Sequence, residues 1–266
     1  MSESKNSEQF DLRFGGTKRL YGQEAVAKLA KSHVCVIGIG GVGSWAAEAL
    51  ARSAVGEITL IDLDDICTTN INRQIHALTD TVGHSKVEVM AQRIAQINPE
   101  CKVNQIEDFV DPDNLSQLIS KDFDYVIDAI DSIRAKVALV AYCKRNKIKI
   151  ITVGGAGGQT DPTQVQVSDL AKTFNDPLAA KLRNELRRHH NFSKNLKRRF
   201  QVECVFSTEQ LRYPQADGSV CAQKATAQGP MKMDCASGFG AATVVTASFG
   251  FVAVAQVIKK LTTVST

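Results

Sequence analysis

A glycine-rich turn near residue 40 limits what this chain can fold into. Apolar residues 34–37 predict a short buried strand, Gly38, Gly40 and Gly43 follow with the spacing G-x-G-x-x-G, and an Ala-rich helix is predicted over residues 45–52. Glycines there let a phosphate approach the backbone, and the helix N-terminus offers free N–H groups and a positive dipole end. The triplet alone is a weak signal, but its position between a strand and a helix favours a nucleotide-binding turn over a ligand-free glycine turn.

The rest of the first half alternates strands with helices. Further strands are predicted at 57–61, 102–106, 125–130 and 148–153, and helices at 23–31, 82–97, 112–120 and 134–145. Such alternation predicts a parallel sheet with right-handed crossovers. After residue 154 the rhythm changes, and short strands at 163–167 and 201–206 predict antiparallel additions. The predicted fold class is therefore α/β, with a Rossmann-like, mostly parallel sheet and an antiparallel C-terminal extension.

The length of 266 residues suits one large domain with a sizeable core. We expect residues 1–22 to form a basic, glycine-broken arm, residues 23–155 the nucleotide-binding half, and residues 156–266 the second half of the same domain. Within that second half we expect a basic helix in 176–199, a mobile loop in 215–235 and an apolar closing helix in 237–260. An uncharged stretch at 236–257 has the length of a membrane span, but its glycine, Thr and Ser residues favour a buried core helix.

Charged residues follow two of the predicted strands. Asp62 lies 19 residues after Gly43, where dinucleotide-type folds place the acid that holds the ribose hydroxyls, and Asp131 follows the strand at 125–130. Because ligands bind at the carboxyl ends of parallel strands, these acids and the turn should share one edge. A loop carboxylate or helix cap is the alternative for Asp62. Lys86 opposes the dipole in the first turn of its predicted helix, which suggests an anionic partner rather than a solvated lysine.

A strongly basic segment lies in the second half. Residues 181–199 carry a net charge of +7 against +4 for the whole chain, which leaves −3 for the rest. Such a concentration fits either a phosphate backbone or a solvated helix face. If the segment binds nucleic acid, the contacts would come from Arg183, Arg187, Arg188, Lys194, Lys197, Arg198 and Arg199.

The seven cysteines are odd in number and form no C-x-x-C pair, which argues against a disulfide framework and a zinc site made of paired knuckles. The first eleven residues are polar and do not read as a signal peptide. We therefore expect a reducing, cytoplasmic compartment.

Taken together in order, these residues carry a family resemblance. The set Gly38, Gly40, Gly43, Asp62, Asp64, Asn70, Asn72, Arg73, Gln74, Lys86 and Asp131 resembles the adenylating enzymes of the ubiquitin-activating superfamily. The segments 13–16, 38–52, 73–76, 154–159 and 234–240 are similar to one branch of it, the tRNA threonylcarbamoyladenosine dehydratases. The resemblance implies an ATP-dependent enzyme that adenylates the threonyl carboxylate of threonylcarbamoyladenosine in tRNA, after which an internal nitrogen closes a ring.

The resemblance also implies roles for individual residues. ATP and Mg²⁺ would be held by Gly38, Gly40, Gly41, Gly43, Asp62, Asp64, Asn70, Arg73, Gln74, Lys86, Asp131 and Ser132. Arg73, Lys86 and Asp131 would take part in catalysis, and Arg13 or Arg19 would reach into the ATP site of a partner subunit in a homodimer. Cys235 would be a nucleophile, a sulfur acceptor from a cysteine desulfurase system or a packed thiol. A monovalent cation near 154–158 is a further expectation.

Three alternatives remain open at this point. The first is adenylation of the C-terminus of a sulfur-carrier or ubiquitin-like protein, against which the missing zinc cysteine pairs and the basic segment speak. The second is an NAD-dependent oxidoreductase, in which Arg73 and Lys86 would have no role. The third is a non-catalytic RNA-binding or sulfur-relay partner.

Overall fold

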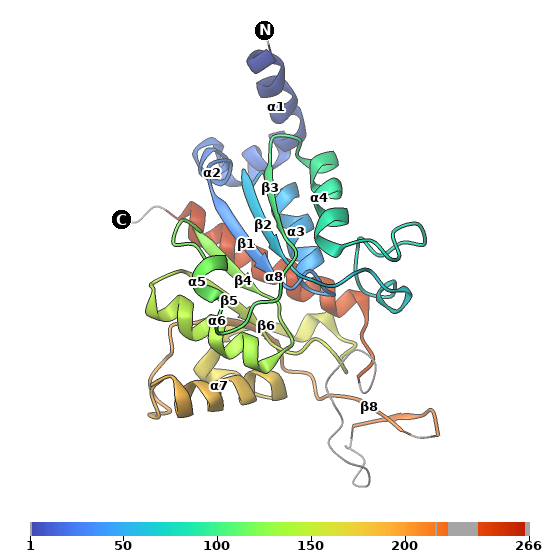
Figure 1. The fold of residues 1–266 in the computed structure, drawn as a ribbon, viewed down its shortest axis with the longest axis vertical. Helices are drawn as coiled ribbons and strands as arrows, with labels where there is room; N and C mark the ends of the chain where they lie inside the picture. Colours follow the sequence, from blue (N-terminus) through green and yellow to red (C-terminus); the bar gives the residue numbers. More distant parts are fainter. Residues whose placement is uncertain (1, 216, 223–238, 264–266) are drawn as a thin grey trace.

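A seven-stranded sheet forms the centre of the molecule (Figure 1). The computed structural model describes residues 2–215, 217–222 and 239–263. The strands are β1 His33–Ile37, β2 Glu57–Ile61, β3 Lys102–Ile106, β4 Tyr125–Asp128, β5 Ile150–Val153, β6 Val165–Asp169 and β7 Glu203–Ser207, in the spatial order β3-β2-β1-β4-β5-β7-β6. All neighbours are parallel except β6, which is antiparallel to β7, and the predicted fold class is confirmed.

One strand direction differs from the prediction. The strand predicted at 201–206 is β7, and it runs parallel to β5 instead of joining as an antiparallel addition. The chain between β5 and β7 includes β6 and a helix, α7 Pro177–His189. This long connection brings the chain back to the end of the sheet at which β5 starts, so β7 can run in the same direction as β5. Only β6 is therefore antiparallel within this sheet.

Helices cover both faces of the sheet. One face packs against α2 Gln23–Leu29, α3 Gly43–Arg52, α4 Lys86–Ile97 and α8 Thr243–Thr262. The other packs against α5 Leu115–Leu118, α6 Ile133–Arg145 and α7. The central strands β1, β4 and β5 are buried on both sides and are near-continuous apolar runs, as expected for a parallel sheet between two helical layers, whereas the edge strands β3 and β6 are partly exposed.

The closing helix α8 lies in the core, as predicted, although it begins at Thr243 rather than at residue 237. Val245, Phe249 and Val257 are fully buried on the sheet. Gly250 allows close packing, because a Cβ there would lie 2.7 Å from the carbonyl oxygen of Val42. By length and composition alone α8 could also cross a membrane, but half of its apolar window is buried inside the protein.

The N-terminal segment is helical, so the prediction of a glycine-broken arm is wrong. Helix α1 spans Ser2–Tyr21 and projects from the body in Figure 1. Two glycines inside a helix cost roughly 1 kcal/mol each, but burial of Phe14 against Val26 and Ala54 offsets part of that cost. Gly22, at φ +90°, ends the helix.

Other boundaries differ where the backbone turns. Helix α4 starts at Lys86 rather than at residue 82, because Gly83 has a φ of +89°. The basic helix α7 ends at His189, and Asn191 adopts a φ of +60°, so the predicted helix does not continue to residue 199. Within the predicted loop 215–235, β9 Val220–Cys221 pairs with β8 Tyr213–Pro214. Most of the remaining loop residues, 216 and 223–235, lie outside the described residues.

We expect Phe249→Ala to destabilise the protein by about 3–5 kcal/mol, because it removes a fully buried ring between α8 and the sheet. The free energy of unfolding, from urea denaturation, measures this effect. Phe251→Ala on the same helix is the matched control, because that ring is 45% exposed and should cost less than about 1 kcal/mol. Equal losses for the two variants would contradict the placement of α8.

Candidate active site

The glycine turn between β1 and α3 is closed tightly on itself. A Cβ on Gly43 would lie 1.8 Å from the carbonyl oxygen of Gly38. Gly38 has a φ of +85°, and a Cβ there would lie 2.9 Å from the carbonyl oxygen of Ala129. The turn therefore requires glycine at both positions. Gly41 and Gly40 face other neighbours, with Cβ positions 3.2 Å from the Arg73 side chain and 3.9 Å from that of Gln74 respectively.

Asp62, directly after β2, braces this turn. Its Oδ2 accepts a hydrogen bond from the Ile39 N–H at 2.6 Å, and its Oδ1 accepts one from the Asp64 N–H at 2.9 Å. Burial raises the pKa of the Asp62 carboxyl, while the nearby Lys86 charge and these two backbone donors act in the opposite direction. The acid that the sequence assigns to a ribose thus also holds the backbone of the glycine turn.

Lys86 is buried at the start of α4 and is not a solvated lysine. Its Nζ lies 2.6 Å from Oδ2 of Asp64 and 3.9 Å from Oδ1 of Asp62. Asp64 is itself half exposed, so the ion pair opens to solvent on one side. The structure therefore gathers the glycine turn, Asp62, Asp64 and Lys86 at the carboxyl edge of the sheet. Asp62 lies beside the turn at this edge, as predicted.

The segment 68–74 borders the turn from the other side. Arg73 Nη1 donates to the Thr69 carbonyl at 2.7 Å and to Asn72 Oδ1 at 3.0 Å, and the Arg73 carbonyl accepts from Trp45 Nε1 at 3.0 Å. Asn70 is buried and caps the short helix Thr68–Asn70 by accepting from the Cys67 N–H at 2.9 Å. Asn70 therefore shapes this loop.

Contacts with the start of α8 hold the same segment in place. Asn72 Nδ2 donates to the Ala241 carbonyl at 3.0 Å, and Thr243 Oγ1 donates to the Asn72 carbonyl. Thr246 lies beside Gly41, 3.5 Å from the position of a Cβ there. Sequence reasoning missed this contact across about 170 residues, because no local pattern signals it.

Several polar groups at this edge have no partner within the described residues, and they test whether a nucleotide fits. The buried Gln74 Oε1 and Ser44 Oγ lack hydrogen bonds. The backbone N–H groups of Gly41 and Val42, ahead of α3, have no acceptor in the described part of the chain. Free N–H groups at a helix start are suited to phosphate oxygens. The residues present therefore fit a bound nucleotide.

Asp131 and Ser132 are exposed at the start of α6, next to the glycine turn. The loop that carries them packs on the turn, since a Cβ at Gly38 would also lie 3.3 Å from the Ile130 nitrogen. Beneath this loop, Lys136 Nζ lies 2.9 Å from Asp128 Oδ2, and both side chains are almost fully buried. Sequence reasoning missed this ion pair, although Asp128 and Lys136 stand eight residues apart across a predicted strand end and helix start.

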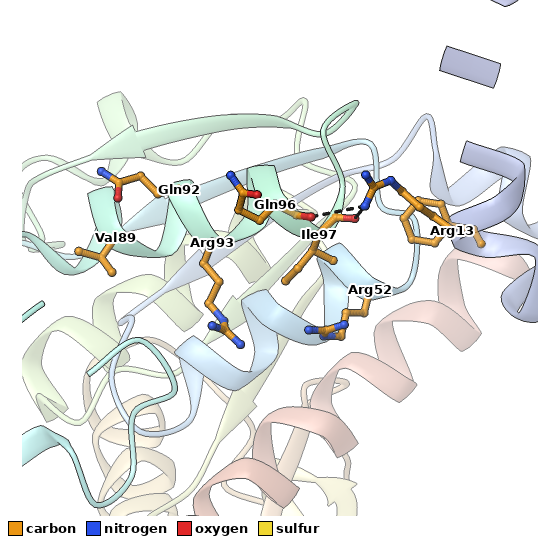
Figure 2. A pocket seen from close by; sticks show the side chains of 8 residues that line it. Arg13, Arg52, Val89, Gln92, Arg93, Gln96 and Ile97 are labelled. Atoms are coloured by element: carbon orange, nitrogen blue, oxygen red, sulfur yellow. Dashed lines mark hydrogen bonds between the residues drawn. The ribbon is translucent and has the colours of Figure 1, made fainter. Parts of the chain in front are cut away.

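Arg13 lies far from the glycine turn of its own chain. Its Nη1 donates to the carbonyls of Gln96 and Ile97 at 3.4 and 3.3 Å. These carbonyls end α4, roughly 17 Å from Lys86 at the other end of that helix. Arg13 lines a pocket of about 670 Å³ together with Arg52 and Arg93 (Figure 2). The guanidinium groups of Arg52 and Arg93 both bind the buried Glu48.

Arg19 lies six residues further along α1 and is exposed. Cys235 lies outside the described residues. Among the cysteines that are described, Cys35, Cys143 and Cys204 are buried thiols, and desolvation raises the pKa of each one, to about 12 for Cys143. Within the described part of the chain, no three His, Cys, Asp or Glu side chains form a cluster that could hold a metal ion.

The basic segment is divided by the structure into bonded and exposed cations. Arg183 is half-buried and donates to Thr173 Oγ1, and burial lowers its pKa. Arg187 donates to the Ser193 carbonyl at 3.3 Å and lies over the Phe200 ring, 5.1 Å from its centroid. The cations with exposed side chains are Lys181, Arg188, Lys194, Lys197, Arg198 and Arg199.

His76 is a buried residue of this edge that sequence reasoning did not assign. Both ring nitrogens lack a hydrogen-bond partner within the described residues. Desolvation, with smaller contributions from the charges of Lys86 and Arg93, lowers its pKa to about 4. The ring is therefore neutral at physiological pH.

Comparison with known proteins gives matches over almost the whole chain. The model of the ThiF family matches residues 17–266. The tRNA threonylcarbamoyladenosine dehydratase of Escherichia coli (strain K12) is 65% identical over 96% of this chain and 95% of that protein. The protein of the same name from Haemophilus influenzae is 57% identical over 96% of this chain and 95% of its own length. The solved structure of the E. coli enzyme in complex with ATP superposes with a TM-score of 0.84 at 58% identity, covering 95% of both chains.

The buried His76 predicts a pH effect on stability. The unfolded chain binds a proton at this ring below pH 6.5, whereas the folded chain binds it only near pH 4, so stability is lost as the pH falls between these values. We expect the wild type to lose up to about 3 kcal/mol more over this interval than His76→Gln. Urea denaturation at several pH values measures the two slopes, and parallel slopes would contradict the expectation.

Proposed function

This chain belongs to the ThiF family, and we propose that it catalyses the ATP-dependent dehydration of threonylcarbamoyladenosine in tRNA. The observation that carries the proposal is the meeting of the glycine turn, Asp62, Arg73 and Lys86 at one sheet edge. Free backbone donors and two cations around one turn suit the phosphates of ATP. Two relatives that carry the name of that activity match this chain over nearly their entire length.

The reaction loses one water from the nucleoside in two steps. ATP supplies an adenylyl group: an oxygen of the threonyl carboxylate bonds to the α-phosphorus while pyrophosphate leaves. An internal nitrogen of the same modification then bonds to the activated carbonyl carbon, AMP leaves with the oxygen, and the nitrogen loses its proton to solvent. Negative charge builds on phosphate oxygens in the first step, so cations placed there beforehand lower the barrier.

We assign roles to the residues at this edge on the same basis. The glycine turn and the N–H groups ahead of α3 would bind phosphates, and Asp62 would bind the ribose while it holds the turn. Arg73 and Lys86 would stabilise the charge on the phosphates. Asp131, exposed at the same edge, would hold Mg²⁺, with Asp64 as the second carboxylate.

The remaining assignments concern the surroundings of the site. The exposed cations from Arg188 to Arg199 would contact the tRNA backbone. A homodimer would cover the exposed Leu12 and Leu20 of α1 and bring Arg13 or Arg19 to the partner's ATP. We also propose a cytoplasmic location, a monovalent cation near residues 154–158 and sulfur transfer through Cys235 as properties to be examined.

Nucleoside mass spectrometry tests the activity. The protein is incubated with ATP and threonylcarbamoylated tRNA, and the modified nucleoside should lose the mass of one water. ATP–pyrophosphate exchange should be stimulated by the modified tRNA and not by a sulfur-carrier protein. Binding of ATP without the dehydrated product would overturn the dehydratase proposal.

We expect Arg73→Ala to lower kcat by roughly a hundredfold or more, because it removes a cation that stabilises charge developing on the phosphates. The rate of product formation at saturating ATP and tRNA measures this effect. Arg145→Ala is the matched control, since that exposed arginine lies at the far end of α6 and should leave kcat unchanged. A wild-type rate for Arg73→Ala would remove Arg73 from the mechanism.

We expect a triple Ala substitution of Lys197, Arg198 and Arg199 to raise the KM for tRNA roughly tenfold. It should also reduce the slope of log affinity against log salt by up to about 3, because each phosphate contact contributes nearly one unit. Ala substitution of the exposed Lys28 and Lys31 is the control, because α2 and α7 lie at opposite ends of Figure 1. Equal salt slopes for both variants and the wild type would place the tRNA elsewhere.

A further inference from the structure

The ion pair between Asp128 and Lys136 lies under the loop that carries Asp131. Asp128 is the last residue of β4, and Lys136 projects from the first turns of α6. Their side chains are 0% and 1% exposed. Burying two opposite charges has a desolvation cost that their attraction offsets only with good geometry and further hydrogen bonds. The further hydrogen bonds of Asp128 and Lys136 therefore indicate which part of the backbone the pair holds in place.

All three N–H groups of the Lys136 ammonium have acceptors. Its Nζ lies 2.9 Å from Asp128 Oδ2, donates to the Ile130 carbonyl at 2.8 Å and donates more weakly to the Asp128 carbonyl at 3.5 Å. The helical Cα–Cβ bond points toward the helix N-terminus, which directs this side chain back under the loop. Lys136 thus binds the backbone directly before Asp131.

Asp128 binds the backbone N–H of the same residue, Ile130, whose carbonyl Lys136 binds. Its Oδ1 accepts from the Ile130 N–H at 3.1 Å, and its Oδ2 accepts from Thr152 Oγ1 on β5 at 2.6 Å. Both backbone polar groups of Ile130 are therefore bound by one buried pair, which is anchored to two neighbouring strands. The next residue along the chain is Asp131.

The loop held in this way also forms one wall of the glycine turn. A Cβ on Gly38 would lie 2.9 Å from the Ala129 carbonyl oxygen and 3.3 Å from the Ile130 nitrogen. The loop therefore lies beside the turn, closely enough to leave no room for a side chain at Gly38, and a shift of the loop away from the turn would move Asp131 from the nucleotide edge. Stability alone does not require such a buried cation, because apolar replacements of buried ion pairs are often tolerated.

We propose that Lys136 is a positioning residue that, together with Asp128, fixes the carboxylate of Asp131 against the glycine turn for the adenylation step. The proposal rests on the function proposed above, in which Asp131 takes part in that step. Lys136 itself is buried and does not reach the substrate. Its effect on the reaction passes through the backbone of Ile130.

Two other groups lie near the pair and belong to its surroundings. The buried Asp176 accepts from the Gly155 N–H at 3.0 Å and from the Ala179 N–H at 2.9 Å at the start of α7. Burial raises the pKa of Asp176, and the Lys136 charge acts in the opposite direction. Cys204 on β7 is fully buried in the same region. Asp176 bonds the turn after β5 and the start of α7, and the Cys204 thiol donates to the Val205 carbonyl within β7, so the hold on Ile130 comes from Asp128 and Lys136.

A double-mutant cycle tests the proposal. Lys136→Met, Asp131→Asn and the double variant are compared by kcat and by the KM for ATP in the tRNA dehydration assay. We expect Lys136→Met to lower kcat roughly tenfold or more with a much smaller change in KM, because misplaced catalytic groups are costly in the transition state. In the Asp131→Asn background, Lys136→Met should have little further effect on kcat.

Two further variants serve as controls for effects on folding. Lys136→Met leaves the Asp128 charge buried without its partner, so Asp128→Asn combined with Lys136→Met is measured as well. This neutral pair should recover the free energy of unfolding yet remain slow, because the Ile130 carbonyl still lacks its donor. Arg93→Met is the matched control: it removes a cation from the buried Glu48, which keeps Arg52, and should leave kcat at the wild-type value.

The outcomes separate this proposal from the proposed function. If Asp131→Asn leaves kcat unchanged, the catalytic role of Asp131 is wrong and the positioning role is wrong with it. If Asp131→Asn slows the reaction but the effects of Asp131→Asn and Lys136→Met on kcat multiply in the double variant, only the positioning role is overturned. Recovery of kcat together with stability in the neutral pair would also overturn it.

Discussion

The close approach of Gly43 to the Gly38 carbonyl is the constraint on which the rest of this site depends. A Cβ at residue 43 would lie 1.8 Å from that oxygen, which is too close for any side chain. The chain can therefore pass from β1 into α3 only with glycine at this position. Three segments distant in sequence then close on the turn: Asp62 bonds its backbone, the loop at 129–130 packs on one side, and α8 packs at Gly250 on another. The turn is thereby held by three segments, and the N–H groups of Gly41 and Val42 ahead of α3 have no acceptor in the described part of the chain.

The same arrangement of charges occurs twice at this edge. Lys86 stands in the first turn of α4 and Lys136 near the start of α6, where a cation opposes the helix dipole. Each is buried and bonded to a carboxylate that ends or follows the neighbouring strand, Asp64 after β2 and Asp128 at the end of β4. The carboxylates offset the cost of burying the lysines. One pair opens to solvent beside the turn, and the other is closed beneath the Asp131 loop.

Charge is also divided between the two ends of the α7 region. At its start, the buried Asp176 bonds the turn after β5, while at its end the chain carries exposed cations as far as Arg199. Arg183 and Arg187 between them are bonded to the protein itself. A polyanion on this surface would therefore meet mainly the segment after the helix, and α7 serves to attach that segment to the sheet.

Local patterns in the sequence were enough to predict the parallel sheet, the glycine turn and the edge that Asp62 and Asp131 share with it, because strand and helix periodicity and the rule that parallel strands end together act over short distances. Tertiary structure alone decided the direction of β7, the helical form of α1 and the burial of Arg183 and Arg187. It also decided that Asn72 is held by α8 and that Asp128 and Lys136 form a buried pair. Each of these features depends on which residues, distant in the sequence, exclude water from a polar group or an apolar ring. The spacing of residues within one segment does not show which distant residues pack against it.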